Sequence, residues 1–238
     1  MKRKLLIGSI VSGFFLYLAM RDIEWGVLWN VLKQTRSLYL IPAVVFTMLG
    51  HYSRSYRWKF MLLPIKSIST WNLFSATSIG FMANNLLPAR LGEIVRAYTV
   101  GRREQISISA AFATIVYERI VDVFSLIVCL WVTLSKVPGP EWLRTSAMWL
   151  IVLNIALFVV MFLMERYQNL VKTIVLKITK PLPDRWRTKI MRWTEAFLNG
   201  LAVMSKAHTL IPITLGSFPV WIFAMLGIYF TFGALNMD

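Results

Sequence analysis

The chain alternates between long apolar runs and shorter basic connections. Runs without a charged residue cover about residues 5–20, 37–52, 145–164 and 210–237. A bilayer core about 30 Å thick needs roughly 20 apolar residues per helix, whereas a run of about 10 to 14 residues is typical of a soluble core helix. The pattern therefore predicts membrane-spanning helices at these positions.

A fifth apolar segment, over about residues 71–100, is interrupted. Its uncharged run ends in the sequence NNLLPAR, in which Pro88 lacks a backbone donor and pushes Leu87 out of the helical conformation. Backbone that is broken at membrane depth is tolerated only inside protein or beside a wet cavity. We therefore expect a re-entrant or broken helix near residues 70–100.

Two more segments complete the predicted elements. Residues 106–135 are long enough for a full span, although they carry charged residues in their middle. Residues 165–207 hold nine Lys or Arg against three acids, with apolar residues at helical spacing and prolines at 181 and 183. This pattern predicts one or two amphipathic helices that lie in the membrane interface. Together the segments predict an all-α protein, a polytopic integral membrane helical bundle formed by a single transmembrane domain over residues 1–238.

Charge adds an orientation to this picture. The chain carries a formal net charge of +15, and its basic residues lie mostly in the connections between apolar runs, which argues against a nucleic-acid-binding domain. With a re-entrant element near 70–100, one side of the membrane receives 18 basic residues and the other side receives 5. Positively charged loops face the cytoplasm. We therefore predict a multi-pass protein of the cell inner (cytoplasmic) membrane with a cytoplasmic N-terminus.

Ionisable residues at membrane depth are the main candidates for a functional site. Each costs at least about 2.5–3.5 kcal/mol on insertion scales and must face a partner or water. Two groups of such residues occur, one after the proline break and one in the middle of residues 106–135. With the neighbouring asparagines and the proline, the candidates for a lipid-headgroup site or cavity are Asn84, Asn85, Pro88, Arg90, Glu93, Arg96, Glu118, Arg119 and Asp122.

The two charged groups allow two interpretations. Three arginines and three acids form a neutral set, so the groups could pair across helices and serve only to fix the packing. In the other interpretation, one or more arginines stay free for a lipid phosphate, which the planar guanidinium binds through two hydrogen bonds. A half-helix that begins after Pro88 would add backbone donors for the same anion.

The sequence RSYRWKF places basic residues beside aromatic ones. Arg54, Arg57 and Trp58 are typical of a helix end that is anchored in the lipid headgroup layer. We predict an interfacial anchor here.

Signatures of soluble enzymes and metal sites are absent from the sequence. It has no GxGxxG, P-loop, HExxH or GxSxG motif. His51 and His208 are far apart in sequence, and Cys129 is the single cysteine. We therefore predict no catalytic residue, no metal site and no cofactor.

Three motifs, in this order, resemble one family. The motifs are RSYRW at residues 54–58, NNLLPARLGEIVR at 84–96 and YERIVD at 117–122. They are similar to the flippase-like, lysylphosphatidylglycerol synthase transmembrane-domain family, which includes the membrane part of multiple peptide resistance factor. The resemblance covers about residues 1–238 and implies a stand-alone member.

This resemblance implies a function in lipid handling. In full-length synthases of the family, the membrane region moves aminoacylated phosphatidylglycerol between leaflets and a separate soluble domain transfers the amino acid. The chain has no stretch that could form that soluble domain, so the resemblance implies binding or translocation of phospholipid rather than an enzyme. The expected partners are membrane lipids, in particular anionic phospholipid such as aminoacylated phosphatidylglycerol, and not nucleic acid.

Two alternatives to translocation remain open. One is a membrane-embedded headgroup transferase of the phosphatidylglycerol lysyltransferase type, with Glu118 or Asp122 as general base. The other is a non-catalytic membrane scaffold. Family members usually continue past the position of Asp238 into further hydrophobic segments, so the resemblance also implies that the chain is incomplete at its C-terminus.

Overall fold

The computed structural model is all-helical over the residues that it describes, which are 17, 20–21, 24–87, 91–136, 139–202 and 207–236, without the side chains of 207–210. By its internal contacts the chain divides into two compact units, one formed by residues 1–45 and 226–238 and the other by residues 46–225. The predicted first span, 5–20, lies almost wholly outside the described residues. The prediction of an all-α membrane protein is confirmed.

The smaller unit holds α2 (Trp25–Gln34), the first residues of α3 (Ser37–Leu62) and the end of α11 (Ser217–Ala234). Within this unit, the residue before α3 is joined to the last residue of α11 by a hydrogen bond of 2.9 Å from the Arg36 amide to the Ala234 carbonyl. The rings of Tyr39 and Phe230 lie 6.2 Å apart.

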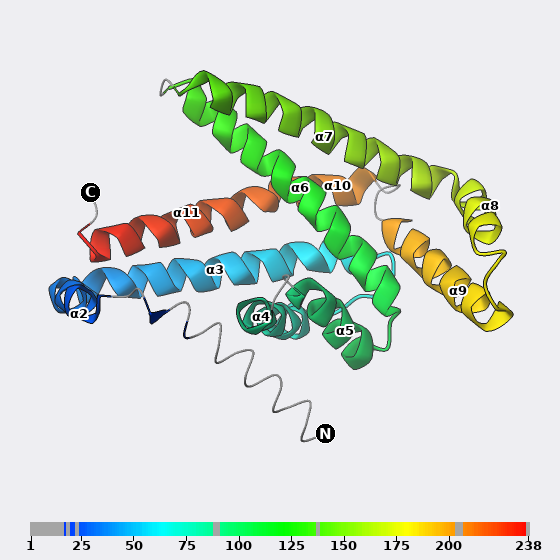
Figure 1. The fold of residues 1–238 in the computed structure, drawn as a ribbon, viewed down its shortest axis with the longest axis horizontal. Coiled ribbons are helices and arrows are strands. Elements are labelled where there is room, and N and C mark those ends of the chain that lie inside the picture. Colours follow the sequence, from blue (N-terminus) through cyan, green and yellow to red (C-terminus); the bar gives the residue numbers. More distant parts are fainter. Residues whose placement is uncertain are drawn as a thin grey trace. The chain divides into compact units, whose positions relative to one another are not determined.

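The larger unit contains the rest of α3 and α11 and all the helices between them. These are α4 (Thr70–Leu86), α5 (Gly92–Glu104), α6 (Ile108–Leu134), α7 (Glu141–Arg166), α8 (Gln168–Ile178), α9 (Asp184–Gly200) and α10 (Ala207–Leu215). Helix α6 is the centre of this unit, since it contacts α5, α7, α9 and α10 (Figure 1).

Two helical segments in the described part of the chain have the length and composition of a membrane span. These are Glu141–Arg166, with a mean hydropathy of 2.6, and Ile211–Ala234, with a mean hydropathy of 1.8. Large apolar side chains on α7 point away from the protein; Trp149, for example, is 70% exposed. Such exposure fits a helix whose solvent is lipid.

The break predicted near residues 70–100 is present. Helix α4 ends at Leu86 and α5 begins at Gly92, while Pro88, Ala89 and Arg90 lie outside the described residues. At 1.5 Å per residue each helix is shorter than the bilayer core of about 30 Å. The two helices pack against each other (Figure 1).

Glycines allow α4 and α5 to approach closely. A Cβ atom at Gly80 would lie 2.9 Å from the carbonyl oxygen of Gly92, and one at Gly92 would overlap the Gly80 carbonyl oxygen. The backbone amide of Gly92 also donates to Asn84 Oδ1 at 2.7 Å. This close packing holds the face of α5 that carries Arg96 against the rest of the unit.

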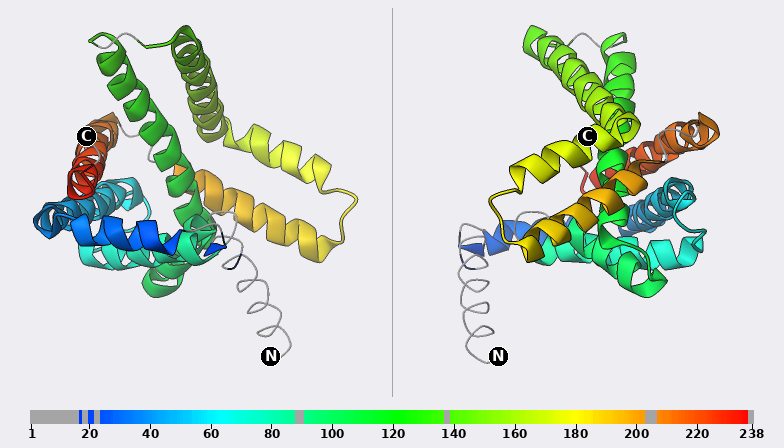
Figure 2. Two further views of the ribbon diagram at one scale, coloured as in Figure 1. Left: turned by 60° about the vertical axis from the view of Figure 1, so that its left-hand side comes forward. Right: turned by 90° about the vertical axis from the view of Figure 1, so that its right-hand side faces the viewer.

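The basic segment forms two helices, α8 and α9, which lie side by side as a hairpin (Figure 2). They are joined by an ion pair of 3.2 Å between Lys172 and Glu195. The C-terminal end of α9 packs on α6, where a Cβ atom at Gly200 would lie 2.8 Å from Ala113 Cβ. The break falls between 178 and 184, around the two prolines.

Candidate functional site

The centre of the site is a pair of buried carboxylates on α6. Glu118 and Asp122 are four residues apart and therefore share one face of the helix. They are 0% and 3% exposed. Buried carboxylates need partners, because an isolated charge in a low-dielectric interior is strongly disfavoured.

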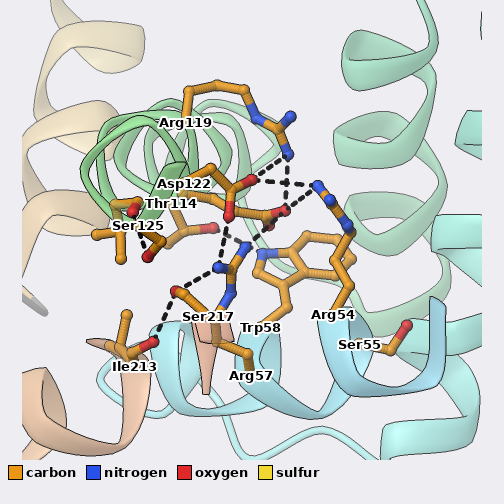
Figure 3. A network of polar contacts seen from close by, with 12 residues as sticks. Arg54, Ser55, Arg57, Trp58, Thr114, Arg119, Asp122, Ser125, Ile213 and Ser217 are labelled. Carbon is orange, nitrogen blue, oxygen red and sulfur yellow. Dashed lines mark hydrogen bonds and ion pairs between the residues drawn. The ribbon is translucent and has the colours of Figure 1, made fainter. Parts of the chain in front are cut away.

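Helix α3 supplies two of these partners. Arg54 Nη1 lies 3.1 Å from Glu118 Oε1 and 3.2 Å from Asp122 Oδ2. Arg57 Nη1 lies 2.6 Å from Asp122 Oδ1, and Arg57 Nη2 lies 3.2 Å from Glu118 Oε1. Figure 3 shows both guanidinium groups reaching from α3 toward α6. A further hydrogen bond joins Arg57 to Ser217 of α11.

Arg54, Arg57 and Trp58, predicted as an interfacial anchor, lie on the part of α3 that contacts α6. Helix α3 continues to Leu62, about ten residues beyond the predicted span of 37–52. Arg57 and Trp58 are almost completely buried within the protein. The two arginines pair with the acids of α6, and the Trp58 indole bonds to Thr114 of the same helix.

Helix α5 contributes a third arginine. Arg96 Nη1 donates to Glu118 Oε2 at 2.9 Å, and its guanidinium lies 3.7 Å from the centre of the Trp58 ring. The Trp58 indole in turn donates to Thr114 Oγ1 at 2.9 Å. The stacked ring and the carboxylate together fix the guanidinium plane.

Arg119 is the fourth arginine and connects the buried carboxylates to the edge of the site. Its Nη2 lies 2.7 Å from Glu118 Oε1 and 3.3 Å from Asp122 Oδ2. Its Nε lies 3.4 Å from Glu93 Oε1 on α5. The side chain is 40% exposed. The two charged groups singled out in the sequence therefore meet across α5 and α6.

We refer to Arg54, Arg57, Arg96 and Arg119 as the arginine cluster. Its four guanidinium groups surround two buried carboxylates, those of Glu118 and Asp122. Glu93 adds a third carboxylate, but it is 36% exposed. Within the described residues, the site therefore carries more buried positive than negative charge.

A small cavity of about 40 Å³ lies beside the cluster, between α4, α5 and α6. It is lined by Thr77, Gly80, Phe81, Asn84, Gly92, Glu93, Arg96 and Arg119. Of the other predicted residues, Asn85 is exposed and does not line the cavity, and Pro88 and Arg90 lie outside the described residues. The polar side chains within this lining, which include Thr77, Asn84 and Arg96, suit a charged or strongly hydrogen-bonding ligand.

Some residues of the site were not recognisable from the sequence. Thr77 lies in an apolar run, and Ser217 is distant from every motif. The sequence does contain a feature that indicates Arg54 and Arg57. These two basic residues are three apart on one helix, a spacing that suits two acids four apart on another helix. In the described part of the chain, no set of three His, Cys, Asp or Glu residues is placed to hold a metal ion.

Comparison with known proteins shows similarity to one family. A family model described as the lysylphosphatidylglycerol synthase TM region matches residues 5–238. A UPF0104 membrane protein of Methanocaldococcus jannaschii is 28% identical over 81% of this chain, and a second from the same organism is 27% identical over 65%. A UPF0104 membrane protein of Methanothermobacter thermautotrophicus is 23% identical over the whole chain.

The relatives are longer than the region that matches. The match covers 60% and 62% of the two Methanocaldococcus proteins and 75% of the Methanothermobacter protein. No solved structure matches the chain significantly.

Proposed function

Because the chain belongs to the family of the lysylphosphatidylglycerol synthase transmembrane region, we propose that this membrane protein binds anionic phospholipid and moves it between the two leaflets. The headgroup phosphate would meet the arginine cluster. Anionic phospholipids, including aminoacylated phosphatidylglycerol, are the proposed partners. The proposal extends to orientation, with the N-terminus and the α8–α9 hairpin in the cytoplasm of a cell with an inner membrane.

The observation that carries this proposal is the surplus of buried arginine. Four guanidinium groups share two buried carboxylates, and three of them, those of Arg54, Arg57 and Arg96, have side chains at most 11% exposed. Uncompensated positive charge inside a membrane protein is unfavourable. An anionic headgroup would compensate it, and arginine is the side chain best suited to phosphate oxygens.

The cluster also argues against the transferase alternative. A general base must be free to accept a proton from the substrate. Glu118 accepts hydrogen bonds from Arg54, Arg96 and Arg119, and Asp122 accepts from Arg54 and Arg57. With their oxygens occupied by guanidinium donors, these carboxylates are better suited to positioning the arginines than to proton transfer.

The proposal is tested by lipid exchange in liposomes. The purified protein is reconstituted with labelled phosphatidylglycerol, and the fraction of label that reaches an outside quencher is followed with time. We expect exchange faster than in protein-free liposomes, and loss of that acceleration in Arg119→Gln. Arg119 is the appropriate position, because removing this partly exposed arginine leaves three arginines for the two buried carboxylates.

Arg144→Gln is the matched control, since Arg144 is an exposed arginine at the start of α7. It should exchange lipid as the wild type does. Wild-type protein that inserts and folds but does not accelerate exchange would contradict translocation. Mass spectrometry of the lipids after the assay distinguishes translocation from the transferase alternative, because headgroup transfer would produce a lipid of a new mass.

A further inference from the structure

We propose that the cavity between α4, α5 and α6 is a phosphate-binding subsite whose ligands are Thr77 and Arg96. This inference rests on the proposed function, which it deepens by naming the atoms that hold the oxyanion. Both residues belong to the lining of the cavity, and both are buried, at 0% and 4% exposure. They come from different helices, so the subsite exists only when α4 and α5 are packed together.

The first observation is the unused hydroxyl of Thr77. A helical Ser or Thr hydroxyl usually donates to the carbonyl of the preceding turn. Thr77 Oγ1 is buried and has no hydrogen-bond partner among the described residues. Other helical hydroxyl groups of this chain do bond to the carbonyl four residues earlier, as at Thr99, Ser125, Thr133, Thr173 and Thr188.

The second observation is the incomplete pairing of Arg96. Its Nη1 donates to Glu118, but Nε and Nη2 are buried and have no hydrogen-bond partner within the described part of the chain. A guanidinium presents Nε and one Nη as a pair of parallel donors, which is the edge that binds two oxygens of a phosphate. The paired Nη1 and the stacked Trp58 ring hold this guanidinium in place.

The cavity supplies the space that such a ligand requires. A site of roughly 10–15 Å³ already holds one water molecule. The volume of about 40 Å³ therefore accommodates a group with several oxygen atoms. Asn84 also lines the cavity, where its Oδ1 accepts from the Gly92 amide. Arg119 and Glu93, both partly exposed, form the outer part of the lining.

A phosphate oxyanion would satisfy the unused groups together. The Arg96 edge donates to two phosphate oxygens, and the Thr77 hydroxyl donates to another. The same chemistry is offered by a phospholipid headgroup and by free inorganic phosphate, and the experiment distinguishes them.

Thr77→Val is the most informative variant. Valine has nearly the shape of threonine but lacks the hydroxyl. Since Thr77 Oγ1 has no hydrogen-bond partner among the described residues, the change breaks none of the hydrogen bonds between them. An unsatisfied buried polar group carries a desolvation cost, which its replacement by an apolar group removes. The variant should therefore fold at least as well as the wild type while binding phosphate at least about tenfold more weakly, the loss typical of a hydrogen bond to a charged group.

The protein in detergent is titrated with inorganic phosphate, and separately with short-chain phosphatidylglycerol, against sodium chloride at equal ionic strength. The unfolding midpoint is followed, because a ligand that binds the folded state raises it. We expect phosphatidylglycerol to raise the midpoint of the wild type, of Thr77→Ser and of the control Thr99→Val. Thr99→Val removes a hydroxyl that bonds within α5. Thr77→Val should need at least about ten times more ligand for the same rise.

The two probes separate the sources of the oxyanion. A rise with inorganic phosphate that Thr77→Val weakens would assign the subsite to phosphate in general, and a rise with lipid alone would assign it to the headgroup. Equal rises in Thr77→Val and wild type, or no rise with either probe, would overturn the subsite. Lipid exchange that is unaffected by Thr77→Val would overturn it while leaving the proposed function intact. Phosphate binding that Thr77→Val weakens, in a wild-type protein that does not accelerate lipid exchange, would support the subsite and contradict the proposed function.

Discussion

Glu118 is the residue on which the arginine cluster depends most. Its two oxygens lie within 3.2 Å of Arg54, Arg57, Arg96 and Arg119, which come from three helices. A buried carboxylate with several cationic partners holds helices together only as long as it stays charged. Without it, Asp122 would be the only buried acid among four guanidinium groups in this cluster.

Glu118→Gln should therefore destabilise the protein strongly. Removing one partner of a buried ion pair typically costs about 3–5 kcal/mol, because the remaining charges stay buried and unpaired. Chemical unfolding in detergent measures this loss. The control is Glu195→Gln, which removes an ion pair with Lys172 on a surface where both side chains are partly exposed. That pair should contribute less than about 1 kcal/mol. Equal stabilities for the two variants would refute the central role of Glu118.

At the scale of elements, the packing of α4 on α5 positions Arg96 and forms the cavity beside it. Two glycines permit this approach, and the Asn84 side chain bonds to the backbone at the start of α5. Helix α5 is too polar and too short to be a membrane span by itself. Its place in the structure therefore depends on contacts with α4 and α6.

Gly92→Ala should separate α4 from α5. The added methyl group would overlap the carbonyl oxygen of Gly80, which is backbone and cannot rotate away. Overpacking of this kind costs about 1–3 kcal/mol or more. We expect a lower unfolding midpoint and faster proteolysis between the two helices.

Gly26→Ala is the control for this change. Gly26 lies within α2, and a Cβ atom there would have no neighbour within 4 Å. Alanine favours a helix over glycine by about 1 kcal/mol, so this variant should be as stable as the wild type or slightly more stable. A stable Gly92→Ala protein with unchanged lipid exchange would show that the close packing is dispensable.

At the scale of the whole molecule, basic residues are concentrated in the α8–α9 hairpin. It follows α7, which is long and apolar enough to cross a bilayer once. The orientation proposed above, which follows the positive-inside rule, puts the hairpin in the cytoplasm and the start of α7 on the opposite side. There the basic side chains would attract anionic lipid near the membrane surface.

Labelling of single cysteines tests this orientation. In a Cys129→Ala background, Glu141→Cys at the start of α7 should react with an impermeant maleimide added outside intact cells. Lys180→Cys, between α8 and α9, should react only after the membrane is permeabilised. Both positions are exposed in the structure, so differences in labelling report the side of the membrane. The reverse pattern would invert the proposed topology.

The sequence alone determined the helical membrane character and the break between α4 and α5. Both depend on local properties: the length of apolar runs, and the inability of a proline to continue a helix. It also indicated Glu93, Arg96, Glu118, Arg119 and Asp122 as candidate site residues, because charges inside apolar segments are costly wherever the helices lie.

Only the tertiary structure decided which helices meet. The period of a helix shows which residues share a face, but it does not show which face of another helix lies opposite. The sequence therefore predicts only a lipid anchor for Arg54, Arg57 and Trp58, whereas their contacts with α6 appear in the tertiary structure. Thr77 became a candidate ligand for the same reason, since an unsatisfied hydroxyl is a property of the surrounding helices rather than of the residue.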